Sequence, residues 1–155
     1  MYLDAIRRTF EVSSGIARKD IIGCTEEEVR SLEEQLGIRA PAAYREWLRW
    51  MGHGAGGFLR GTDVFYDDDL PSLKEGALEL FHENELDGAL PADALVFYLH
   101  QGYVTQFMQL SEGDDPPIYG YAEGSGQRGP TRWYDNLSAW LAVELADHLK
   151  FTRAR

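Results

Sequence analysis

Residues 24–59 read CTEEEVRSLEEQLGIRAPAAYREWLRWMGHGAGGFL, and this stretch contains the clearest helix start in the chain. Thr25 precedes Glu28 by three positions, a spacing that lets each side chain satisfy a free backbone amide of the other at a helix start. Apolar residues then recur at helical spacing until Gly37, a residue type that commonly ends helices. The stretch therefore predicts a helix that begins after Thr25 and ends at Gly37.

A second helix is predicted over residues 42–51. Pro41 is pre-organised for a first-turn position, and Gly52 is a natural terminator. Its apolar face consists of Tyr44, Trp47, Leu48 and Met51. The two helices, joined by a short connection, form a helical hairpin.

Outward from the hairpin, the pattern changes from helices to strands and back to a helix. Apolar residues recur weakly at helical spacing from Leu3 to Phe10 and from Leu73 to Phe81, which predicts a helix in each segment. The spacing is clearer in the last segment, where Asp135 or Asn136 can cap a closing helix. Strands are predicted at 64–66, 95–99, 103–110, 118–122 and 131–134.

The apolar run at 95–99 is short and continuous, which is typical of a strand covered on both faces. With 103–110 it predicts a hairpin at the centre of a sheet. We therefore expect an α+β fold, a single domain over 1–155, with an antiparallel-rich central sheet packed against N-terminal and C-terminal helices.

The charge balance argues against two classes of partner. Asp and Glu total 26 against 15 Lys and Arg, giving a formal net charge of -11. Such a chain is repelled by phosphate backbones and anionic membranes, so we expect neither nucleic acid nor membrane as a partner. Two interpretations stay open: simple solubility, which charge alone favours, and steering toward a basic protein.

Cysteine content and the first residues indicate a compartment. The chain has 1 Cys, so no internal disulfide can form, and this fits a reducing environment. The opening MYLDAIRRTFEV carries acids and lacks the apolar core of a signal peptide. We expect a cytoplasmic protein.

No constellation of residues predicts an active site, a metal site or a cofactor. The loop Gly52 to Gly61 lacks the ending of a phosphate-binding loop and follows a helix instead of opening one. The 4 His are scattered without ligand spacing, and Cys24 has no base nearby in sequence, so we expect structural roles for them. An enzyme or small-ligand binder that uses His53 and the glycine-rich loop is the weakest alternative.

The candidate partner-binding residues are acidic and aromatic. Asp67, Asp68, Asp69, Asp114 and Asp115 fall in loops, where solvated charge is the plain interpretation and recognition of a basic partner is the functional one. They do not match a calcium-binding loop.

Two of the four tryptophans complete the candidate set. Trp47 and Trp140 lie on apolar stripes and are predicted to be core. Trp50 lies off its stripe and Trp133 at a strand end, so we expect both to be partly exposed and available to a partner.

The chain resembles the SMI1/KNR4 (SUKH) superfamily over about residues 20–150. The resemblance is carried by residues 24–59 and by three later segments, LPADALVFYLHQGYVTQFMQL, EGDDPPIYGY and WYDNLSAWLAVEL. The resemblance implies an α+β fold without a catalytic motif. It also implies a frequent bacterial role as an immunity protein that binds and neutralises a cognate toxin domain. Other members are scaffold or regulatory proteins, which is the alternative function. Where members often have Asn-Gly after the second helix, this chain has Met51-Gly52-His53-Gly54.

Overall fold

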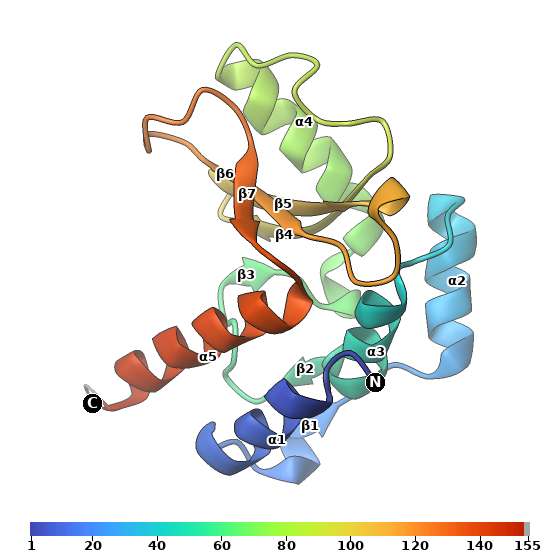
Figure 1. The fold of residues 1–155 in the computed structure, drawn as a ribbon, viewed down its shortest axis with the longest axis vertical. Helices are drawn as coiled ribbons and strands as arrows, with labels where there is room; N and C mark the ends of the chain where they lie inside the picture. The colour runs from blue at the N-terminus through green and yellow to red at the C-terminus, as the bar shows by residue number, and fades with distance from the viewer. Residues whose placement is uncertain (154–155) are drawn as a thin grey trace.

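A five-stranded antiparallel sheet, flanked by helices, organises the computed structural model, which describes residues 1–153 (Figure 1). The α-helices in this range are α1 (Asp4–Ser13), α2 (Glu26–Leu36), α3 (Ala42–Met51), α4 (Leu73–Glu83) and α5 (Leu137–Arg153). None of them combines the length and apolarity that a bilayer crossing requires. The order of helices, strands and a final helix confirms the predicted α+β class.

The sheet has the order β3-β4-β5-β6-β7, and each neighbouring pair is antiparallel. Its strands are β3 (Thr62–Asp63), β4 (Ala94–His100), β5 (Val104–Gln109), β6 (Ile118–Ala122) and β7 (Thr131–Tyr134). Gln101 and Gly102, both with positive φ, form the turn between β4 and β5. The predicted hairpin therefore lies in the interior of the sheet.

Shorter elements connect the larger ones. A separate two-stranded sheet pairs β1 (Ile21–Ile22) with β2 (Gly54–Ala55). The 3-10 helices are η1 (Arg18–Asp20), η2 (Tyr66–Asp68), η3 (Leu70–Ser72) and η4 (Leu110–Glu112). The small sheet ties the segment before α2 to the segment after α3, which positions the cluster described below.

The helix boundaries follow from local chemistry. The Thr25 hydroxyl accepts from the Glu28 amide at 3.1 Å, and the Glu28 carboxylate accepts from the Thr25 amide at 2.9 Å, so the predicted capping box is formed. Gly37 ends α2 at φ 64, a left-handed conformation that suits glycine. At α5, the Asn136 carboxamide oxygen accepts from the Ala139 amide, so Asn136 is the cap and not Asp135.

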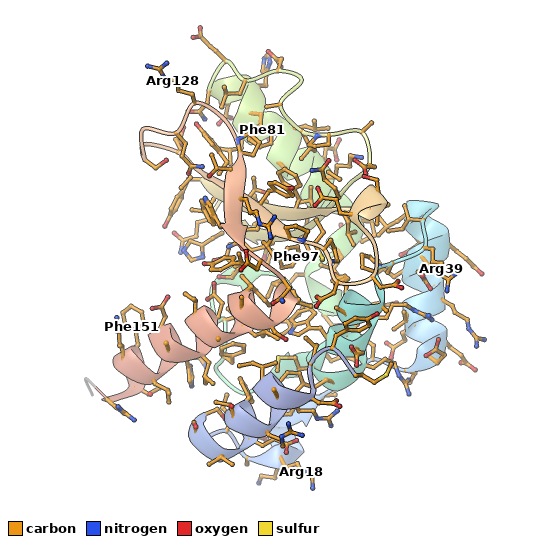
Figure 2. The ribbon with its side chains drawn as sticks, viewed as in Figure 1. Arg18, Arg39, Phe81, Phe97, Arg128 and Phe151 are labelled. Atoms are coloured by element: carbon orange, nitrogen blue, oxygen red, sulfur yellow. The ribbon has the colours of Figure 1, made fainter. Side chains whose placement is uncertain are left out.

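The sheet has a helix layer on each side. α4 lies on one side, and α3 and α5 lie on the other (Figure 1). On the α3 and α5 side, Trp140 packs edge-on against both Phe97 and Trp47, with ring centroids 5.2 and 5.9 Å apart. On the α4 side, Phe81 packs against Tyr121. Figure 2 shows Phe97 in the interior and Phe81 at α4. The first five residues of β4 are all buried, so this strand is covered on both faces, as its continuous apolar run predicted.

One predicted strand was wrong. Residues 64–66 do not form a strand, and β3 instead occupies the two preceding residues, Thr62–Asp63. The Asp68 carboxylate accepts from the amides of Val64 and Phe65 at 3.1 and 3.0 Å, which occupies the donors that a neighbouring strand would need. The apolar run is a turn closed by an aspartate, followed by η2.

Candidate protein-binding surface

The first acidic run is partly used for local structure. Asp68 closes the turn just described, and Asp69 has φ 56 in a left-handed conformation. The Asp67 carboxylate bonds the Nδ1 of His53 at 2.9 Å. Asp67 and Asp69 are exposed, whereas Asp68 is half-buried. Two of the three carboxylates thus face solvent at this loop.

The second acidic run lies against the start of α3. The Asp114 carbonyl accepts from the Ala43 amide at 2.9 Å, which leaves the Asp114 carboxylate exposed. Asp115 is half-buried, and burial raises the pKa of its carboxyl group because desolvation disfavours the charged form. Within residues 1–153, the Asp115 Oδ1 atom is buried without a hydrogen-bond partner.

The two acidic runs do not form one patch. Asp114 contacts the first turn of α3, whereas Asp67 contacts His53, two residues beyond the last turn. A ten-residue α-helix spans about 15 Å. Each run therefore offers a separate small acidic surface.

The expectation of partial exposure is wrong for Trp50. Its side chain is only 6 % exposed. Phe10 of α1 packs against the ring with centroids 5.2 Å apart, and the Arg7 guanidinium lies 5.6 Å from its centroid. α1 packs against this flank of α3 and covers Trp50. The periodicity of α3 alone predicts this position to be exposed.

Trp133 is half-buried on β7, as expected for a strand-end aromatic. Its ring lies over Gly120 of the neighbouring strand β6, where an added Cβ would overlap the indole. The absence of a side chain at Gly120 therefore allows the Trp133 ring to pack directly on β6.

An open cleft of about 530 Å³ lies between α5 and the segment Gly57–Thr62. Tyr98 and His100 of β4 contribute to its lining. Phe151, near the end of α5 (Figure 2), contributes to the lining and is 74 % exposed. An exposed aromatic beside a hollow is typical of surfaces that bind proteins.

Two carboxylates of α5, Glu144 and Asp147, line the same cleft. Burial, with a smaller contribution from the Asp147 charge, raises the pKa of Glu144 to about 7. No salt bridge involves either carboxylate in the described part of the chain. A half-buried acid of this kind gains stabilisation when a cation enters beside it. Nothing in the sequence marked these residues, because they lie at helical spacing within the closing amphipathic helix.

A further polar cluster surrounds His53. Its Nε2 lies 2.7 Å from Glu28 Oε2, and its Nδ1 is bonded to Asp67. The hydrogen bond to Asp67, followed by the bond to Glu28, raises the pKa of His53. Beside it, burial and the charges of Glu28 and Asp67 raise the pKa of Cys24 to about 12, which keeps the free thiol protonated at neutral pH.

The other histidines are held separately. The His100 Nδ1 lies 2.8 Å from the Thr62 hydroxyl, His82 pairs with Asp87 at the surface, and the His148 ring packs against Phe58. His100 and His148 both line the cleft, whereas His53 lies in the cluster beside Cys24. His53 therefore does not line the cleft, and the two acids that it contacts, Glu28 and Asp67, belong to the separate cluster beside Cys24.

Comparison with known proteins identifies one family. The model of the SMI1 / KNR4 family (SUKH-1) matches residues 23–143, which is most of the chain and includes α2, the central sheet and the start of α5. No curated protein matches the sequence.

Proposed function

Since the chain belongs to the SMI1/KNR4 (SUKH-1) family, we propose that it is a non-enzymatic binding protein, and specifically an immunity protein that neutralises a bacterial toxin by binding its toxin domain. Family membership is the observation that carries this proposal, because immunity is a frequent role of its bacterial members. The absence of a catalytic motif in the sequence agrees with a stoichiometric inhibitor.

The partner is a basic protein domain. With a formal net charge of -11, the chain attracts a positively charged surface and repels acidic competitors. Domains that act on nucleic acids carry such basic surfaces because they bind phosphates. We therefore propose a toxin domain with a basic active-site face as the partner, and neither nucleic acid nor membrane.

The contacting surface includes the cleft beside α5 and the exposed acids of the two loops. Among residues 1–153 neither Glu144 nor Asp147 has a salt-bridge partner; Asp147 offers negative charge next to Phe151, and Glu144 offers a carboxyl group that a neighbouring cation would ionise. A lysine or arginine of the partner would insert its charge at these carboxylates while its aliphatic stem packs on the aromatic ring. Asp67, Asp69 and Asp114 add exposed charge that steers association, and the half-buried Trp133 lies at a strand end.

The test is capture and protection. The tagged protein is incubated with the products of neighbouring genes, and any captured protein is expressed with and without it in a sensitive host. We expect one toxin-domain protein in equal stoichiometry and survival of the host only when both are present. Recovery of housekeeping proteins without any protection would replace this proposal with the scaffold or regulatory alternative.

Matched variants then locate the contact surface. Asp147→Asn combined with Phe151→Ala should weaken capture at least tenfold if the cleft is the contact, whereas the loop variants Asp67→Asn and Asp114→Asn test the acidic runs. Glu79→Gln, an exposed charge change on α4, serves as the control. Equal capture by all four would show that neither surface makes the decisive contact.

A further inference from the structure

Three side chains of different chemistry converge where α2 begins and α3 ends. Cys24 lies just before the cap of α2, Glu28 lies in its first turn, and His53 follows α3 by two residues. The Cys24 Sγ, a Glu28 carboxylate oxygen and a His53 ring nitrogen all lie within 4.8 Å of one another. This set of thiol, carboxylate and imidazole contains the donor types that zinc prefers.

The backbone holds these residues together independently of their side chains. The Cys24 amide donates to the Leu48 carbonyl at 2.8 Å, and the His53 amide donates to the Ile22 carbonyl at 2.9 Å. Two glycines permit this approach. A Cβ on Gly23 would overlap the Arg49 carbonyl, and a Cβ on Gly52 would overlap the Cys24 sulfur. The donors are thus presented by a fixed junction between the two helices.

The orientation of His53 is also fixed from its far side. Asp67 Oδ2 lies 2.9 Å from Nδ1, which directs Nε2 toward Glu28 Oε2 at 2.7 Å. A carboxylate that holds the outer nitrogen of an imidazole is the usual second partner of a metal-bound histidine. Among residues 1–153, no hydrogen bond involves the Cys24 sulfur, so its lone pairs remain available.

We propose that Cys24, Glu28 and His53 bind a divalent transition-metal ion of the zinc class, with Asp67 orienting His53. Zinc bonds of about 2.0–2.3 Å place two ligand atoms of a tetrahedral site roughly 3.3–3.7 Å apart. Glu28 Oε2 and His53 Nε2 lie 2.7 Å apart, so the distance between them must increase by less than about 1 Å to admit the ion. A thiolate and a carboxylate balance its charge.

The donor set selects the class of ion. Calcium and magnesium take oxygen ligands almost exclusively, whereas a sulfur and an imidazole nitrogen favour zinc or its neighbours. Cys24 is only 3 % exposed, but Glu28 and His53 are half-buried, which leaves an entry path and a fourth position for water. The ion would fasten the start of α2 to the segment after α3, and Asp67 would connect the first acidic run to it through His53.

Cobalt titration of the full chain tests this proposal. Co²⁺ substitutes for Zn²⁺ and gives a thiolate-to-metal charge-transfer absorption only when sulfur is a ligand. We expect one equivalent of Co²⁺ to produce this band, and one equivalent of Zn²⁺ to displace it and to raise the melting temperature. Absence of the band in the wild-type chain would overturn the proposal.

Variants assign the ligands. Cys24→Ser, which is nearly isosteric, should abolish the charge-transfer band, and His53→Ala and Glu28→Gln should weaken zinc affinity at least tenfold. Asp67→Asn should weaken it about 10- to 100-fold while leaving the band in place at saturation. His82→Ala, which removes a surface histidine paired with Asp87, is the control and should change nothing.

Circular dichroism before titration checks that each variant is folded. Since Asp67 is exposed, Asp67→Asn provides a test even where a core variant unfolds. Unchanged zinc affinity in folded His53→Ala and Asp67→Asn would show that the ion binds elsewhere and would overturn the assignment.

Discussion

Glu144 is the residue whose environment departs furthest from that of a surface acid. Burial raises its pKa to about 7 from an ordinary value of 4.5, and Asp147 adds to the shift. The native state therefore holds a proton on Glu144 that the unfolded chain releases above about pH 4.5. The stabilisation from this proton is complete below the unfolded pKa and is lost as the pH rises through 7.

Glu144→Gln should therefore stabilise the protein in a pH-dependent manner. We expect little difference from wild type at pH 4.5 and a free energy of unfolding higher by about 1–3 kcal/mol at pH 8, where wild type must bury a charge. Urea titrations of both proteins at the two pH values measure this. Burial and then the Glu144 charge raise the pKa values of Tyr98 and Tyr134, and both phenols stay protonated from pH 4.5 to 8, so they do not contribute to the pH dependence. A stability gain that does not depend on pH would contradict the prediction.

Gly23 is a residue at which a single added carbon should be costly. Its Cα lies so close to the Arg49 carbonyl that a Cβ would overlap backbone atoms, which cannot move aside as a flexible side chain can. We expect Gly23→Ala to lower the free energy of unfolding by about 1–3 kcal/mol. Gly57→Ala is the matched control, because its Cβ would meet only the Arg60 side chain at 3.8 Å. Equal effects in urea denaturation would refute the close-packing argument.

At the residue scale, periodicity predicted burial well where one helix decides it. Trp47 and Trp140 lie on apolar stripes and are fully buried. It failed for Trp50, because Phe10 and Arg7 of α1 cover this ring from about 40 residues away in sequence. The same limit explains why the grouping of Cys24 with His53 was missed, since ligand spacing is informative only within one element.

At the scale of elements, the start of α2 carries the clearest local signal, and the structure forms it in full. Thr25→Ala removes the hydroxyl that accepts from the Glu28 amide and should cost about 1 kcal/mol of stability. Thr25→Ser, which retains the hydroxyl, should remain within about 0.5 kcal/mol of wild type. Thermal or urea unfolding distinguishes the two. A serine variant as unstable as the alanine variant would show that the methyl group and not the cap matters.

The strands were predictable to different degrees for a physical reason. β6 and β7 occupy the predicted residues, and β4 and β5 differ from prediction by one residue at each end, because turn residues, Gly and Pro bound the apolar runs. The error at 64–66 arose because the side chain of Asp68 replaces a neighbouring strand as the acceptor for Val64 and Phe65. When a side chain accepts the backbone hydrogen bonds that a neighbouring strand would accept, the apolar pattern of the sequence does not change. The pattern therefore cannot distinguish this turn from a strand.

At the scale of the whole molecule, the excess of acidic residues should govern how a partner arrives more than how tightly it stays. Once a partner is captured, its association rate should fall steeply as salt rises from about 0.05 to 0.5 M, while its dissociation rate changes less. Surface plasmon resonance across that range separates the two rates. If salt acts mainly on dissociation, or on neither rate, electrostatic steering is not how the partner is recruited.

The rate at which Cys24 is labelled should report how often the junction between α2 and α3 opens. As the single cysteine, buried at the α2 and α3 junction, it can react with an alkylating reagent only when that junction opens. Under conditions where closing is faster than reaction, the labelling rate divided by that of an unfolded peptide gives the opening equilibrium constant. One thiol therefore measures the free energy of separating the two helices in the native protein, without denaturant and without an introduced probe.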